Sequence, residues 1–210
     1  MSTKRIILFA AVLLTSISAL AQRADVFGEY SYVHFSPTIG GLSSVSLNGG
    51  GGGADLYFLK ILGIKADFMK YASTTFTRTY NTPVTIPGKG TIPAGTYSVQ
   101  GDMFTYLFGP VLRLPFPLVK PFGEVLFGGS STNAYANLAK EINAAGGSIS
   151  VPSQHPFTMA AGGGVDVSVS RHVAIRLAEF DYMLTRYANP LTSTDHQNNF
   201  RYTGGLVLKF

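Results

Sequence analysis

The sequence predicts an all-β protein, an eight-stranded antiparallel up-and-down transmembrane β-barrel with short periplasmic turns and long outer loops. The first observation is the composition: of 210 residues, 46% are hydrophobic and only 13% are charged. That charged share is about half the usual value for soluble domains. With 24 Gly, 15 Phe and 11 Tyr, the chain favours strands and turns over helices. The other two observations are an export signal and a series of alternating segments.

The cysteine count and the net charge exclude several classes of function. There is no Cys, so disulfide scaffolds, thiol nucleophiles and thiolate zinc sites are excluded. The net charge of +5 falls to +3 once Lys4 and Arg5 are removed with the export signal. No cluster of Lys and Arg accompanies this small excess, and nucleic-acid binding requires such a cluster. We therefore expect no nucleic-acid partner.

The N-terminus has the three parts of a secretory signal peptide, at residues 1–21. Lys4 and Arg5 are followed by an apolar stretch from Ile6 to Leu14 and by small residues at Ala19 and Ala21. The apolar stretch is shorter than the roughly 18 to 20 residues of a membrane-spanning helix. A short N-terminal anchor is the alternative. Residues 22–210 then form the barrel domain, because a closed barrel is the other structure that satisfies every backbone group in lipid.

Eight segments of alternating polarity follow, each about 10 residues long, the length of a tilted membrane strand. In the fourth segment the faces are ambiguous, because Asp102 shares the parity of Phe104. In the seventh the alternation slips near Ala178 and Glu179. That slip predicts a β-bulge, which returns Asp181 to the side of Arg176. The eight segments are 26–36, 50–58, 63–72, 99–108, 120–130, 157–169, 172–187 and 199–210.

The connections between these segments indicate whether the apolar face of the barrel points outward to lipid or inward to a soluble core. Alternation alone also fits a soluble sandwich or a lipocalin-like barrel with its charges outside. Short or moderate connections alternate with long ones, which is typical of transmembrane barrels. The short ones are 59–62, 111–119 and 170–172, and the long ones are 37–47, 73–98, 131–155 and 188–198.

A narrow polar lumen explains the charges that stand among small residues on the inner faces. An eight-stranded barrel is just wide enough for side chains to fill it, so opposite charges must meet there. An unpaired charge would cost roughly several kcal/mol. We expect Arg176 or Arg201 to pair with some of the acids Glu29, Asp67, Glu124 and Asp181. The full set of lumen candidates is Glu29, Asp67, Glu124, Asp166, Arg176, Asp181 and Arg201.

The end of the chain carries the most specific motif, Thr203-x-Gly205-x-x-Leu208-x-Phe210. It is similar to the terminal strand of outer-membrane barrels, which the barrel-assembly machinery reads. Together with 26–32 (VFGEYSY) and 176–182 (RLAEFDY), it resembles the small OmpA-type outer-membrane β-barrel family in its barrel-only form. The resemblance implies a monomer in the bacterial outer membrane, in contact with lipid and lipopolysaccharide. With Phe210 as the last residue, we expect no peptidoglycan-binding domain.

Candidate chemistry is sparse, and we expect no catalytic residue, no metal and no cofactor. Barrel lipid A deacylases use a His-x-Ser pair with a nearby Glu, and His34-Phe35-Ser36 is similar, with Glu29 as the available acid. A histidine at the membrane rim is the simpler interpretation. Asp195-His196 lies in the last loop without a spacing that demands a protease. The glycine runs 49–53 and 162–164 lack the following helix and Lys-Ser/Thr of phosphate-binding loops.

The sequence thus favours a non-enzymatic barrel that contributes to envelope structure and to surface contact through its long loops, with a possible surface ligand. The alternatives are a lipid-modifying outer-membrane enzyme and a small diffusion channel. Aromatic side chains are expected to form girdles at the two membrane interfaces. The girdle candidates are Tyr30, Tyr32, Phe68, Tyr71, Tyr182 and Tyr187.

Overall fold

The computed structural model describes residues 23–35, 45–86, 90–149, 155–186 and 196–210. The predicted signal peptide at 1–21 lies outside these residues and stays a prediction. Parts of the four long connections also lie outside them, as do Ser36, Tyr187 and Asp195.

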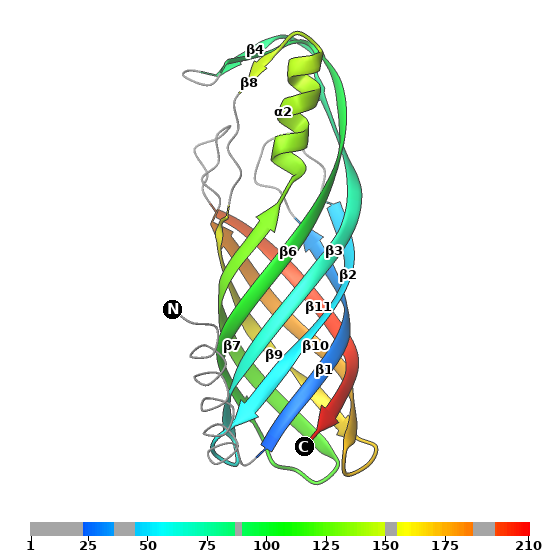
Figure 1. The fold of residues 1–210 in the computed structure, drawn as a ribbon, viewed down its shortest axis with the longest axis vertical. Helices are drawn as coiled ribbons and strands as arrows, with labels where there is room; N and C mark the ends of the chain where they lie inside the picture. Colours follow the sequence, from blue (N-terminus) through cyan, green and yellow to red (C-terminus); the bar gives the residue numbers. More distant parts are fainter. Residues whose placement is uncertain (1–22, 36–44, 87–89, 150–154, 187–195) are drawn as a thin grey trace, which may run out of the picture.

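Eight strands form a closed barrel in which each strand is antiparallel to both of its neighbours (Figure 1). The order around the barrel is β1, β11, β10, β9, β7, β6, β3, β2, so β1 closes the cylinder against β11. The predicted fold class is confirmed. The strands are β1 (Arg23–Phe35), β2 (Val45–Tyr57), β3 (Leu62–Tyr80), β6 (Gly95–Arg113), β7 (Val119–Thr132), β9 (Phe157–Ser168), β10 (Val173–Arg186) and β11 (His196–Lys209).

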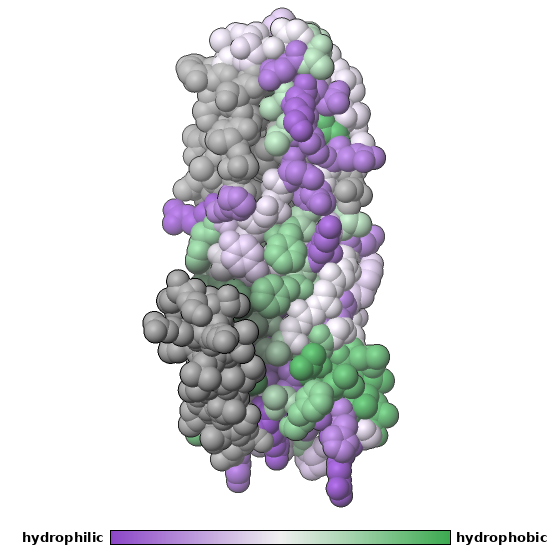
Figure 2. Space-filling model, viewed as in Figure 1, coloured by the Kyte–Doolittle hydropathy of each residue, from purple (hydrophilic) through white to green (hydrophobic). Residues whose placement is uncertain are grey.

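Alternate residues of each barrel strand face the outside, and most of those side chains on the barrel wall are apolar. On β1, Val26 and Tyr30 are exposed while Phe27 and Glu29 are buried. The ambiguous fourth segment resolves in the same way, because Phe104 and Phe108 lie outside. On the face shown in Figure 2, hydrophobic residues gather on the lower part of the barrel and hydrophilic ones along the upper extension. This apolar surface suits acyl chains. No helix in the described part of the chain is long and apolar enough to cross a membrane.

Four of the predicted girdle residues, Tyr30, Tyr32, Phe68 and Tyr182, lie on the outside of the barrel, whereas the prediction is wrong for Tyr71. Tyr30 and Tyr182 are exposed to 55% and 53%, as the girdle requires. Tyr71 is fully buried, and its hydroxyl lies 3.1 Å from the Ser31 hydroxyl inside the barrel. The reason is parity: Tyr71 shares a face with Lys65 and with the other inward residues of β3.

At the outer end of the barrel, the structure has strands and a helix in segments that were predicted as loops. β3 and β6 continue beyond the other strands as a two-stranded ribbon (Figure 1), and pairing extends to Tyr80 and Gly95. Their hydroxyls pair across the ribbon, with Thr77 Oγ1 lying 3.0 Å from Ser98 Oγ. Above it, β4 (Val84–Ile86), β5 (Gly90–Ile92) and β8 (Ser148–Ile149) form a small sheet. The predicted segments 63–72 and 99–108 are shorter than β3 and β6 because only membrane-spanning lengths were expected. Cross-strand hydroxyl pairs also stabilise strands outside the membrane.

One helix, α2 (Ala134–Ala144), stands beside β6 in a segment predicted as a loop. Its Leu138, Ala139 and Ile142 recur at helical spacing and pack on the ribbon. They meet Tyr80, Ile92 and Tyr97 in a hydrophobic core outside the barrel. We call the ribbon beyond Tyr71 and Met103, the small sheet and α2 the outer platform.

Candidate functional site

The inner half nearest the short turns is crowded with charges. Among the described residues, eight carboxylates and four cations are buried to at least 93%. We call this set the charged half of the interior. The carboxylates are Asp25, Glu29, Asp55, Asp67, Glu124, Asp166, Glu179 and Asp181, and the cations are Lys65, Arg113, Arg176 and Arg201.

Arg176 lies at the centre of this half and contacts four acids. Its Nη1 donates to Glu29 Oε1 at 2.6 Å and to Glu179 Oε2 at 2.9 Å. Its Nε donates to Asp166 Oδ1 at 2.8 Å, and its Nη2 lies 3.6 Å from Asp55 Oδ2. Five N–H groups in a fixed fork allow one guanidinium to serve several carboxylates at once. A single cation thus joins β1, β2, β9 and β10.

Arg201 performs the same role one layer further from the short turns. Its Nη1 lies 2.5 Å from Asp67 Oδ2, and its Nε and Nη2 both lie 2.8 Å from Asp181 Oδ2. Because Arg201 is on β11, Asp181 on β10 and Asp67 on β3, this cation bridges opposite walls of the barrel.

Lys65 is the third cation of the network, and two aromatic rings flank it. Its Nζ donates to Glu124 at 2.9 Å and to Glu179 at 2.8 Å. It also lies 4.9 Å from the centre of the Phe27 ring and 5.3 Å from that of Phe122. Arg176 lies over the same two rings, at 4.8 and 4.4 Å. Ring faces attract cations, and the attraction strengthens in a desolvated site.

Glycine makes room for both rings. A Cβ at Gly53 would collide with the Phe27 ring and with the Ala66 carbonyl oxygen. A Cβ at Gly164 would collide in the same way with the Phe122 ring. Gly53 and Gly164 are therefore close-approach positions inside the barrel, where a side chain would displace an aromatic ring.

The predicted β-bulge in β10 is confirmed, since the register shifts between Arg176 and Glu179 against β11 and between Arg176 and Ala178 against β9. The bulge turns Glu179 inward as well as Asp181. Glu179 then contacts all three central cations, because its Oε1 also lies 3.4 Å from Arg201 Nη2.

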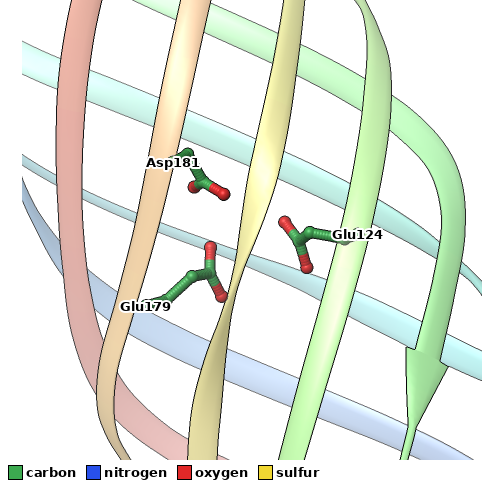
Figure 3. Close-up of side chains that lie close together, drawn as sticks. All are labelled: Glu124, Glu179 and Asp181. Carbon is green, nitrogen blue, oxygen red and sulfur yellow. The ribbon is translucent and has the colours of Figure 1, made fainter.

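Three carboxylates point toward one another in the space between β7 and β10 (Figure 3). Oxygen atoms of Glu124, Glu179 and Asp181 lie within 4.8 Å of one another, a spacing that a metal ion could use. Lys65 and Arg201 already contact these same carboxylates. The trio is therefore neutralised by side chains, and the geometry is that of an ion-pair network.

The inner half nearest the outer platform is different, since it contains a cluster of apolar side chains and, among its described buried polar residues, only uncharged ones such as Thr158 and Thr185. We call it the apolar half. Met69, Leu107 and Met183 are each fully buried within it. Its cluster comprises Val33, Leu47, Met69, Tyr71, Met103, Leu107, Leu126, Ala160 and Met183. This packing was not predicted, because a uniformly polar lumen was expected.

The structure places all seven predicted lumen residues inside the barrel and joins them in ion pairs. Glu124 pairs with Lys65 rather than with an arginine. Sequence reasoning missed five members of the charged half, although strand parity was a usable signal for those that alternate with outward apolar neighbours. The missed residues are Asp25, Asp55, Lys65, Arg113 and Glu179.

His34 lies on the opposite side of the barrel wall from the interior charges. Its Nδ1 lies 3.3 Å from Ser46 Oγ, which also contacts the Tyr32 hydroxyl at 2.7 Å. Glu29 faces inward and pairs with Arg176, so Glu29 does not complete a triad with His34. The predicted His-x-Ser partner, Ser36, lies outside the described residues.

The residues of the predicted assembly signal lie on β11 and at the chain end. Thr203 is buried inside, opposite Ser31 of β1, and Gly205 lies opposite Glu29. Leu208 and Phe210 are exposed to 48% and 75% on the outside. The motif thus alternates small inward residues with apolar outward ones.

Comparison with known proteins finds likeness in fold only. No protein-family model matches the chain, and no curated protein matches it by sequence. OprG from Pseudomonas aeruginosa is similar with a TM-score of 0.56 at 14% identity, covering 90% of this chain and 96% of OprG. Neisserial surface protein A has a TM-score of 0.54 at 11% identity, over 89% and 97% of the two chains.

Ail from Yersinia pestis, solved in complex with the heparin analogue sucrose octasulfate, gives a TM-score of 0.50 at 11% identity. The match covers 90% of this chain and 98% of Ail. These likenesses agree with the apolar outer surface and the sealed, charged interior. The chain therefore has the fold of the small eight-stranded outer-membrane β-barrels.

Proposed function

We propose that the protein is a non-enzymatic outer-membrane barrel that holds the outer platform at the cell surface for contact with a ligand. The observation that carries this proposal is the hydrophobic core outside the barrel. Tyr80, Ile92, Tyr97 and Ile142 are buried to at least 92% in a region where the barrel itself needs no core. A segment that only connected two strands would not require such packing.

Polar contacts also fix α2 to the ribbon. The Asn137 side-chain amide donates to the Gln100 carbonyl oxygen at 2.8 Å. The Asp102 backbone N–H donates to Asn133 Oδ1 at 3.0 Å, just before the helix begins. Contacts at both the base and the middle of α2 hold it in one position, so the platform presents a fixed surface. Preorganisation of this kind lowers the entropic cost of binding a ligand.

The rest of the molecule serves as the anchor in this proposal. The apolar outer surface contacts lipid and lipopolysaccharide, β11 presents the signal that the barrel-assembly machinery reads, and the barrel acts as a monomer. A diffusion channel is disfavoured by the packed interior, because both the charged half and the apolar half fill it with side chains.

Attachment assays with bacteria that produce the protein test the proposal. One surface is bare polystyrene and the other carries immobilised heparin, a probe chosen because Ail was solved with a heparin analogue. The test variant Ile142→Asp removes an apolar side chain from the platform core and leaves the barrel wall intact. The matched control Glu141→Asp changes the exposed neighbour on the same helix.

We expect Ile142→Asp to reduce attachment to at least one surface, while Glu141→Asp attaches like the unaltered protein. Heat-modifiable migration on a gel checks that the barrel folds in each variant. Removing residues 73–98 and 131–155 together, with barrel assembly preserved, provides the larger lesion. If both the deletion and Ile142→Asp attach like the unaltered protein, surface contact is not the role of the platform.

A further inference from the structure

A basic pocket opens at the short-turn end of the barrel, opposite the outer platform. Its volume is about 390 Å³. Five Lys or Arg side chains line it, together with a single Asp or Glu, Asp25. We call it the periplasmic pocket. Its cations are Arg23, Arg113, Lys120, Arg171 and Lys209.

The Asp25 carboxylate in the periplasmic pocket already forms an ion pair with Arg113. Asp25 Oδ2 accepts from Arg113, whose guanidinium stacks on the Tyr57 ring with its centre 3.8 Å from the ring centre. In the part of the chain that the structure describes, no carboxylate pairs with Arg23, Lys120 or Arg171. Three cations in the pocket therefore form no direct ion pair with a described Asp or Glu, and the chain-terminal carboxylate of Phe210 is the other acidic group of the lining.

The two other cations, Arg113 and Lys209, are held in place. Arg113 is 96% buried between Asp25 and Tyr57. Lys209 Nζ donates to Ser168 Oγ at 3.0 Å and to the Ser170 carbonyl oxygen at 3.1 Å. A concave surface with a clear excess of positive charge focuses its field on a small anion. These contacts distinguish the pocket from an ordinary solvated charged face.

We propose that the periplasmic pocket binds the phosphate group of an anionic ligand. Phosphate offers several charged oxygens at once, which suits a ring of Arg and Lys donors. Two sources carry this chemistry at the inner face of an outer membrane: a phospholipid head group and a soluble phosphate. Leu118 and Phe116, exposed to 59% and 54% on either side of Pro117 at the pocket wall, are suitable contacts for an acyl chain.

The test uses the full mature chain refolded in an uncharged detergent. Native mass spectrometry counts bound phosphatidylglycerol, and isothermal titration calorimetry measures binding of inorganic phosphate. The test variant is Lys120→Gln with Arg171→Gln. The control is Lys60→Gln with Lys140→Gln, which removes the same charge from two exposed lysines outside the pocket. Heat-modifiable migration shows that each variant folds.

We expect the unaltered protein and the control to bind one phosphate-bearing ligand. The test variant should bind about tenfold more weakly for each cation removed, since a charge-assisted hydrogen bond contributes about that much. Binding of phosphatidylglycerol alone identifies a lipid head group as the source, whereas binding of inorganic phosphate identifies a soluble one. The proposal is overturned if neither probe binds, or if the control loses affinity as much as the test variant.

Discussion

The two halves of the barrel interior solve the same packing problem by opposite means. The charged half fills the lumen with Arg176, Arg201, Lys65 and their acids. The apolar half fills it mainly with apolar side chains, together with uncharged polar ones such as Thr158 and Thr185. Both halves belong to the same strands and both consist of buried side chains. Their difference lies in how specific each contact must be.

The charged half depends on particular partners, whereas the apolar half depends mainly on volume. An ion pair loses its value once one partner is removed, because the other charge stays buried. An apolar side chain can be exchanged for another of similar size at little cost. Paired substitutions in the two halves should therefore give different losses of stability.

The largest effect is expected for Arg201→Met. This change keeps most of the side-chain volume but leaves Asp67 and Asp181 without their cation. Breaking a buried ion pair costs about 3 to 5 kcal/mol in the free energy of unfolding. Urea unfolding of the protein refolded into lipid vesicles, followed by gel migration, measures this loss. Arg171→Met, at an exposed arginine in a short turn, should change stability by less than about 0.5 kcal/mol. Equal losses in the two variants would contradict the ion-pair account.

A smaller loss is expected for Leu107→Ala in the apolar half. Leu107 is fully buried in the apolar cluster, and the shortened side chain leaves a cavity. The expected loss is about 3 kcal/mol in the same urea experiment. Leu107→Met is the matched control, because it conserves volume and should cost less than about 1.5 kcal/mol. If Leu107→Met were as damaging as Leu107→Ala, this half would be as specific as the charged one.

The coupling between Lys65 and Glu124 gives a third, smaller effect. The substitutions Lys65→Met and Glu124→Gln are measured alone and together in a double-mutant cycle. Since the two groups lie 2.9 Å apart, the two changes should be non-additive by about 2 kcal/mol. The pair Leu107→Met and Leu126→Met is the corresponding cycle in the apolar half and should be closer to additive. Additivity within about 0.5 kcal/mol for Lys65 and Glu124 would show that the contact does not contribute.

The smallest effect on stability is expected for His34→Ala, because His34 belongs to neither half of the interior. His34 contacts Ser46 on the outer face and no interior charge. The stability should change by less than about 0.5 kcal/mol. The lipid A of cells that produce this variant should have the same mass profile as that of cells with the unaltered protein. A shift in acylation that depends on His34 would support the lipid-modifying alternative instead.

Strand parity predicted most of the barrel because membrane strands have a strict period of two. It placed Glu29, Asp67 and Glu124 inside, where the structure has them. Parity fails where the backbone is irregular. The bulge in β10 was predicted, but its effect on Glu179 was not, because a bulge can turn two nearby residues inward and the sequence does not say which.

The outer platform was the least predictable region. Residues Leu138, Ala139 and Ile142 have a helical spacing that was available in the sequence. The helix is stabilised by its contacts with Tyr80 and Tyr97, which are distant along the chain and could not be identified as its partners from the sequence. Partner choice inside the lumen was unpredictable for the same reason: the pairing of Glu124 with Lys65 depends on which walls face each other after closure.

The seam between β1 and β11 joins the first and last strands of the chain over eleven paired positions, from Asp25 with Lys209 to Phe35 with Asn199. Arg201 lies on β11, and the acids it neutralises lie on β3 and β10. An unfinished sheet therefore holds carboxylates that lack their counter-ion and must remain hydrated. Closure of the seam and neutralisation of these two carboxylates therefore depend on the same strand.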